Sequence, residues 1–81
     1  MFTAWKYIII QEGGLEIPIL FPEILPHKDM AKGKVVISAG FVSMESYEDA
    51  IGIKCYGESV TLGKESRPIV DGDIIEAMLN G

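Results

Sequence analysis

The residues best suited to hold a ligand lie in the stretch 55–68, which is rich in hydroxyl groups and glycines. Its polar candidates are Tyr56, Ser59, Ser66 and Arg67. A guanidinium group binds a phosphate or a carboxylate bidentately, and neighbouring hydroxyl groups can complete such a site. The stretch contains neither a phosphate-binding loop nor a dinucleotide-binding motif. It therefore predicts a site for a small anionic, nucleotide-like ligand.

The same stretch can also be interpreted as an exposed loop without a ligand. Arg67 would then pair with Asp71 or Glu65, as arginines at protein surfaces commonly do. Asp71 and Asp73 lie at the start of an expected C-terminal helix, where their carboxylates would repel an anion. Ser38 has two interpretations as well, because a polar group in a buried strand bonds either a neighbouring backbone or a ligand.

His27 and Cys55 are the two side chains that could act as a base and a nucleophile. His27 follows Pro26 at the start of a short expected helix, where it would contact an anion, act as a base or cap the turn. Cys55 lies inside an expected strand and is interpreted as a small buried hydrophobic residue. A hydrolase that uses Cys55 with His27 is a further hypothesis. No catalytic constellation is visible, and we expect a protein that is not an enzyme.

Metal and cofactor sites are not predicted. The chain has one cysteine and one histidine, which excludes an intrachain disulfide and a zinc site built from these residue types. The acidic residues of the segment 44–50 lack the spacing of a calcium-binding loop, so we expect a solvated loop there. The cysteine content also favours a reducing, cytoplasmic compartment.

The hydrophobic pattern predicts an α+β fold in a single domain over residues 1–81. Strands are expected at residues 3–10, 15–21, 34–43, 51–56 and 60–62, and helices at residues 26–32 and 73–79. The fold class is a small antiparallel sheet of two hairpins plus a short strand, with the short helix between the hairpins and a C-terminal helix.

Local features refine these elements. Pro18 lacks an N–H group and places its strand at a sheet edge, whereas the apolar run 34–43 is typical of a central strand. Gly40 indicates a bulge or a close backbone approach. Asp73 with Glu76 has the spacing of a helix capping box, and Asp71 is a competing N-cap (the residue that precedes the first helical turn).

Composition argues against two classes of partner. Seven Lys and Arg residues against twelve Asp and Glu residues give a net charge of -5, which disfavours nucleic acid. No apolar run approaches the ~18 residues of a membrane span, and the start lacks the pattern of a signal peptide. Phe2, Trp5 and Tyr7 would mark a partner surface if exposed and belong to the core if buried. In so small a domain an apolar content of 48% leaves apolar surface for self-association, so we expect a homodimer or a higher homo-oligomer.

Short motifs along roughly residues 18–75 resemble a group of short, uncharacterised phage and prophage accessory proteins. The matching residues are Phe21-Pro22-Glu23, His27, Ala31, Ser38-Ala39-Gly40-Phe41, Cys55-Tyr56-Gly57-Glu58-Ser59, Leu62-Gly63, Ser66-Arg67-Pro68 and Asp71. The resemblance implies a genomic setting more than an activity. It places the protein in the cytoplasm of an infected bacterium, where small phage proteins typically bind and inhibit a host component.

These observations together predict a non-enzymatic binding protein without a cofactor. It would engage a host protein, for example as an inhibitor of host defence, or sequester a small anionic ligand. The residues expected to bind that ligand are His27, Ser38, Tyr56, Ser59, Ser66 and Arg67. The alternative is a structural or assembly subunit that acts through homo-oligomerisation.

Overall fold

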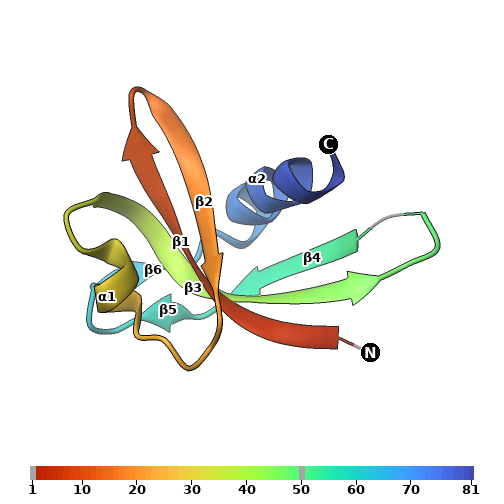
Figure 1. Ribbon diagram of the computed structural model, residues 1–81, viewed down its shortest axis with the longest axis horizontal. Helices are drawn as coiled ribbons and strands as arrows, with labels where there is room; N and C mark the ends of the chain where they lie inside the picture. Colours follow the sequence, from red (N-terminus) through yellow and green to blue (C-terminus); the bar gives the residue numbers. More distant parts are fainter. Residues whose placement is uncertain (1, 50) are drawn as a thin grey trace.

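The protein folds as a small α+β domain in a computed structural model that describes residues 2–49 and 51–81, and side chains from Trp5 onward (Figure 1). A four-stranded antiparallel sheet is accompanied by a two-stranded sheet, a short helix and a C-terminal helix. The elements are β1 (Phe2–Glu12), β2 (Leu15–Phe21), α1 (His27–Ala31), β3 (Val35–Ser46), β4 (Ile51–Tyr56), β5 (Glu58–Ser59), β6 (Lys64–Glu65) and α2 (Pro68–Asn80). The predicted fold class is confirmed.

The large sheet has the strand order β2-β1-β3-β4, so that two hairpins meet along β1 and β3. Gly13 and Gly14 join β1 to β2 with φ angles of 59° and 81°, as a tight two-residue hairpin turn requires. That turn places Pro18 in a pair that makes no ladder hydrogen bond, so its missing N–H costs nothing. The predicted edge position of β2 and central position of β3 are both confirmed.

Side chains of the sheet alternate between two apolar clusters, one on each face. The cluster under α2 contains Tyr7, Ile9, Val42, Cys55 and Ile75. The cluster on the α1 side contains Ile8, Ile10, Phe21, Ala31 and Ala39. Trp5 is partly buried against the first cluster, whereas the side chain of Phe2 lies outside the described residues. The aromatic residues Trp5 and Tyr7 therefore serve the core.

Helix α2 begins at Pro68, five residues before the predicted start at residue 73. Pro68 occupies the first helical turn, where a missing N–H is tolerated. Asp71 accepts a hydrogen bond at 2.9 Å from the backbone N–H of Arg67, the residue before the helix. The predictions of a capping box at Asp73 and Glu76 and of an N-cap at Asp71 were both wrong, because Arg67 is the N-cap and Asp71 bonds its N–H from within the helix.

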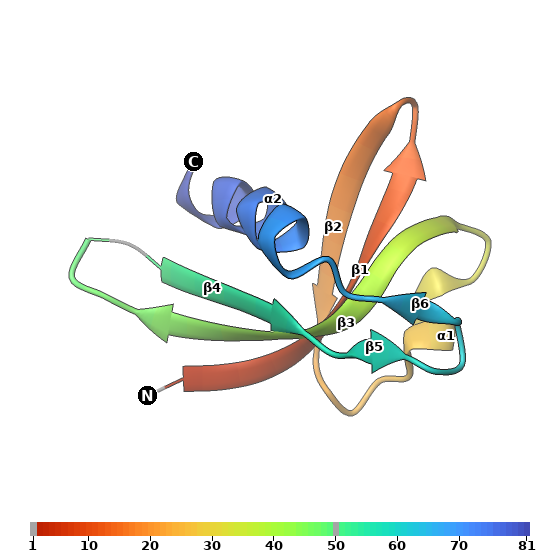
Figure 2. The ribbon, with the colours of Figure 1, turned by 180° about the vertical axis from the view of Figure 1, so that it is seen from behind.

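Two further boundaries differ from expectation. Residues 60–62 form part of the turn between β5 and β6 instead of a strand. Strand β3 continues to Ser46, into the segment expected to be a loop. Figure 2 shows β5 and β6 packed against the first half of β3, near α1. Within residues 2–49 and 51–81, no helix has the length and apolar character needed to cross a membrane.

Candidate functional site

A fully buried carboxylate, that of Asp71, draws together polar side chains from three parts of the chain. Tyr7 Oη donates to Asp71 Oδ2 at 2.5 Å, and Ser38 Oγ donates to Oδ1 at 2.9 Å. Arg67 donates from its backbone N–H at 2.9 Å and from Nε at 3.0 Å. These donors offset the cost of removing a carboxylate from water.

Ser66 completes the group, which we call the Asp71 network: Tyr7, Ser38, Ser66, Arg67 and Asp71. Ser66 Oγ lies 2.7 Å from Tyr7 Oη, and because the tyrosine proton points to Asp71, the serine is the donor. Burial, and then the hydrogen bond to Asp71, raise the pKa of Tyr7 above its ordinary value. The phenol therefore stays protonated and continues to donate.

A bulge in β3 helps to aim Ser38 at this network. Ile9 faces Ser38, whereas the next residue, Ile10, faces Val36, so Ile37 is the extra residue. A bulge bends the strand and shifts the alternation of its side chains by one residue, so that Val36 and Ser38 lie on opposite faces of the sheet. Ser38 therefore lies on the α2 face, where Asp71 receives its hydroxyl group.

Arg67 is engaged on both sides. Its Nη2 lies 2.8 Å from Asp71 Oδ1 and 2.7 Å from Glu16 Oε1 on β2. Of the two interpretations of Arg67, the structure shows the pairing with Asp71. An anion approaching this guanidinium would have to displace a carboxylate that is already bound to it.

His27 lies on the other face of the sheet, away from the Asp71 network. Its ring packs edge-on against Phe21 and Phe41, at centroid distances of 5.5 Å and 5.7 Å. Nε2 donates to the carbonyl oxygen of Gly40 at 2.8 Å, because a carbonyl can only accept. The ring is buried and bridges α1 to β3.

Gly40 makes the close backbone approach that was predicted. A Cβ atom there would lie 2.5 Å from the carbonyl oxygen of Tyr56 and 3.1 Å from Cβ of Ser66. The absence of a side chain thus lets the segment after β4 cross β3 and carry Ser66 to Tyr7.

Tyr56 and Ser59 share no hydrogen bond with the Asp71 network within the described residues. Tyr56 is 41% exposed and stacks on Phe41. Ser59 is buried, accepts a bond from the Leu62 N–H and lies 3.3 Å from Thr61 Oγ1, which holds the β5–β6 turn. Of the six residues predicted to bind a ligand, the structure gathers only Ser38, Ser66 and Arg67.

Cys55 is buried under α2, on the opposite face of the sheet from His27. Burial, and then the negative charge of Asp71, raise the pKa of the thiol to about 11. A thiol with a raised pKa is a poor nucleophile at neutral pH. The pairing of Cys55 with His27 that a hydrolase would need is absent.

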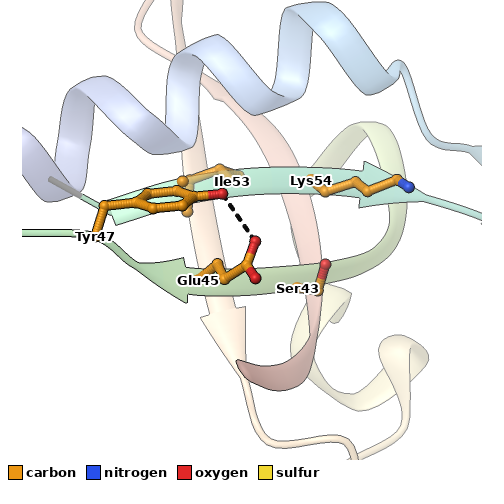
Figure 3. A pocket seen from close by; sticks show the side chains of 6 residues that line it. Ser43, Glu45, Tyr47, Ile53 and Lys54 are labelled. Carbon is orange, nitrogen blue, oxygen red and sulfur yellow. Dashed lines mark hydrogen bonds between the residues drawn. The ribbon is translucent and has the colours of Figure 1, made fainter. Parts of the chain in front are cut away.

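A second polar surface lies at the far end of hairpin β3–β4 and was not predicted. It is a hollow of about 390 Å³ lined by Ser43, Glu45, Tyr47, Gly52, Ile53 and Lys54 (Figure 3). We call it the hairpin hollow. Ser43 pairs with Lys54 and Glu45 pairs with Gly52 across the two strands, so these positions share one face of the sheet.

The ring of Tyr47 forms one wall of the hairpin hollow. Tyr47 Oη donates to Glu45 Oε2 at 2.8 Å, and this bond raises the pKa of the phenol. The ring covers Gly52, because a Cβ atom at that position would overlap ring atom Cε2. At 61% exposure, the tyrosine still presents much of its surface to solvent.

Sequence reasoning missed this surface because it ended the strand at residue 43. The signal that could have found it is the alternation of Ser43, Glu45 and Tyr47, which continues the two-residue period of β3.

A scan against protein-family models and searches of curated proteins and of solved structures found no match to this chain.

Proposed function

We propose that this protein is a non-enzymatic binding protein that engages another protein through the hairpin hollow. The observation that supports this most is the position of the hollow. α1, β5 and β6 lie at one end of the molecule, whereas hairpin β3–β4 extends to the other end (Figure 1). Tyrosine is enriched at protein interfaces, and opposite charges on an open sheet face offer electrostatic complementarity to a partner.

The competing version, capture of a small anion by Arg67, has weaker support. The guanidinium is held by Asp71 and Glu16, and Asp71 is fully buried. Releasing Arg67 to a ligand would leave that carboxylate with fewer partners inside the protein, which costs several kcal/mol. The Asp71 network is better explained as the polar part of the core.

The two edges of the large sheet also favour contact through a face. Pro18 removes an N–H group from the outer side of β2. Asn80 in α2 bonds both backbone groups of Ile51 at the start of β4, with two bonds of 3.3 Å. Both edges are thus poor templates for an added strand.

The resemblance to phage accessory proteins suggests the kind of partner. We propose a host protein in the bacterial cytoplasm, whose activity the contact would inhibit. Covering the hollow would bury the exposed ring of Tyr47 within the contact, and buried aromatic anchors contribute strongly to binding.

Site-specific photo-crosslinking in bacterial cells tests this proposal. A photoreactive residue replaces Lys54 in the hairpin hollow, and a matched control replaces Asp73, which is exposed on α2. We expect a discrete crosslinked species from position 54 and none from position 73. Equal products from both positions, or none from position 54, would refute the proposal.

Self-association is the second candidate, and the accessible surface favours it. The protein exposes 5221 Å², whereas a monomer of this mass exposes about 4,800 Å². Large apolar side chains at the surface include Ile24, Val60 and Ile69. Sedimentation over a range of concentrations decides between the two, because a monomer at every concentration would exclude this candidate.

A further inference from the structure

We propose that the hairpin hollow receives an arginine and a carboxylate placed two residues apart on an extended segment of the partner. This inference rests on the proposed function and names the chemistry of the contact. The hollow presents an acceptor at one end and a cation at the other, at a separation set by the strand itself.

The acceptor end consists of Glu45 and the ring of Tyr47. Glu45 Oε2 accepts a bond from Tyr47, and within the described residues Oε1 has no hydrogen-bond partner. A carboxylate oxygen can accept more than one bond, so both oxygens stay open to a guanidinium. Arginine also stacks on aromatic rings, which the neighbouring tyrosine allows.

The long-range electrostatic field of the protein also favours an arginine in the partner. The chain has a net charge of -5, so a basic group is attracted from a distance. Arginine fits better than lysine, because its flat guanidinium can contact the ring and pair with the carboxylate together.

The cationic end consists of Lys54 and Ser43, which face each other across β3 and β4. Within the described residues Lys54 makes no ion pair. Figure 3 shows the Ser43 hydroxyl directed toward β4 and the Lys54 side chain extending along β4, away from Glu45. A flexible ammonium group and a hydroxyl group on paired positions of the two strands suit a carboxylate. A carboxylate there would also offset the repulsion between Lys54 and an incoming arginine.

The spacing links the two ends. Ser43 and Glu45 are two residues apart on the same face of β3, and a strand rises about 3.4 Å per residue. The two contacts are therefore separated by about 6.8 Å along the strand. An extended segment of a partner has the same repeat, so side chains at positions i and i+2 would meet both ends.

Titration of the isotope-labelled protein with capped pentapeptides tests this inference by NMR. Two peptides carry the charges two residues apart, Gly-Glu-Ala-Arg-Gly and Gly-Arg-Ala-Glu-Gly. The control, Gly-Ala-Glu-Arg-Gly, has the same composition and net charge with the charges adjacent. We expect amide shifts centred on Tyr47 and Gly52, and an affinity about threefold higher for one spaced peptide than for the control. Equal affinities, or shifts centred elsewhere, would overturn the inference.

Variants separate the two contacts. Glu45→Gln and Lys54→Gln should each weaken binding of the preferred peptide by about three- to fivefold, the contribution of one exposed ion pair. Tyr47→Phe keeps the ring and should bind like the parent, whereas Tyr47→Ala should not. Glu76→Gln, on α2, is the matched control. If position 54 crosslinks a partner while the spaced peptides bind no better than the control, this inference fails and the proposed function stands.

Discussion

At the residue scale, Asp71 is the side chain on which the polar interior depends. It receives hydrogen bonds from β1, from β3 and from the segment before α2, and it is completely shielded from solvent. A buried charge with good partners is often near neutral for stability as a unit, but removing one member leaves the others unpaired. The contribution of Asp71 should therefore appear as strong non-additivity, in the free energy of unfolding, among substitutions of the network residues.

Asp71→Ala should lower the free energy of unfolding by about 3–5 kcal/mol, because it leaves Tyr7, Ser38 and Arg67 without their shared acceptor. Ser38→Ala removes one neutral donor and should cost about 1 kcal/mol. Urea denaturation of both variants measures the difference. A change below about 1 kcal/mol for Asp71→Ala would contradict the role assigned to this carboxylate.

Cys55 gives a prediction about pH. Its pKa rises from an ordinary value of 9.0 to about 11 in the folded protein. Between these values the unfolded chain releases the thiol proton and the folded chain retains it, so stability falls as pH rises. The loss is at most about 1.4 kcal/mol per pH unit.

Urea denaturation at a series of pH values, for the wild type and for Cys55→Ala, measures this loss. The stability difference between the two proteins should shrink above about pH 9. Tyr7 also has a raised pKa and contributes the same trend at higher pH in both proteins, so the comparison isolates the thiol. A constant difference across the series would show that the thiol titrates normally.

At the scale of elements, the hairpins and the edge strand follow from local rules that the sequence displays. The Gly13-Gly14 turn, Pro18 at the edge and the apolar run in β3 all lie where they were expected. The start of α2 differs from the expected one. Local sequence patterns place Asp71 before the helix, whereas in the structure Asp71 lies within the helix and accepts a bond from the N–H of Arg67. Long-range partners fix that choice, and no local pattern records them.

The candidate site shows the same limit. The sequence predicts for Arg67 either a ligand or a pair with Asp71 or Glu65, and Asp71 is one of its two partners in the structure. Glu16 was not, because it is 51 residues away in sequence and meets Arg67 only once β2 and α2 are packed. The sequence does not predict the hairpin hollow, because β3 continues three residues past its expected end at residue 43.

Two glycines test how closely the elements are packed. Gly40→Ala should destabilise the protein by about 1–3 kcal/mol, because its Cβ would overlap the backbone where the chain crosses β3. Gly72→Ala is the matched control within α2, since apart from its chain neighbours and the helix backbone no atom lies within 4 Å of a Cβ added there. It should stabilise the protein by about 0.5–1 kcal/mol through helix propensity. Thermal unfolding should show a lower melting temperature for Gly40→Ala and a higher one for Gly72→Ala. Changes of the same sign in the two variants would contradict this packing.

At the scale of the whole molecule, the protein is longer and flatter than a sphere, with extents of 38 × 28 × 17 Å. Its radius of gyration of 12.1 Å is close to the roughly 11.7 Å expected for this chain length. The elongation comes from hairpin β3–β4, which extends away from α1 (Figure 1). A projecting hairpin with an exposed aromatic ring is accessible to a large partner, whereas the carboxylate at the centre of the Asp71 network is buried.

The affinity of the crosslinked partner for the wild type and two single variants tests this division of roles most directly. Tyr47→Ala, in the hairpin hollow, should weaken binding about tenfold or more, as loss of an aromatic anchor does. Glu76→Gln, exposed on α2, should leave the affinity unchanged. Unaltered affinity of Tyr47→Ala, with the fold intact by NMR, would contradict the assignment of the hairpin hollow as the binding surface.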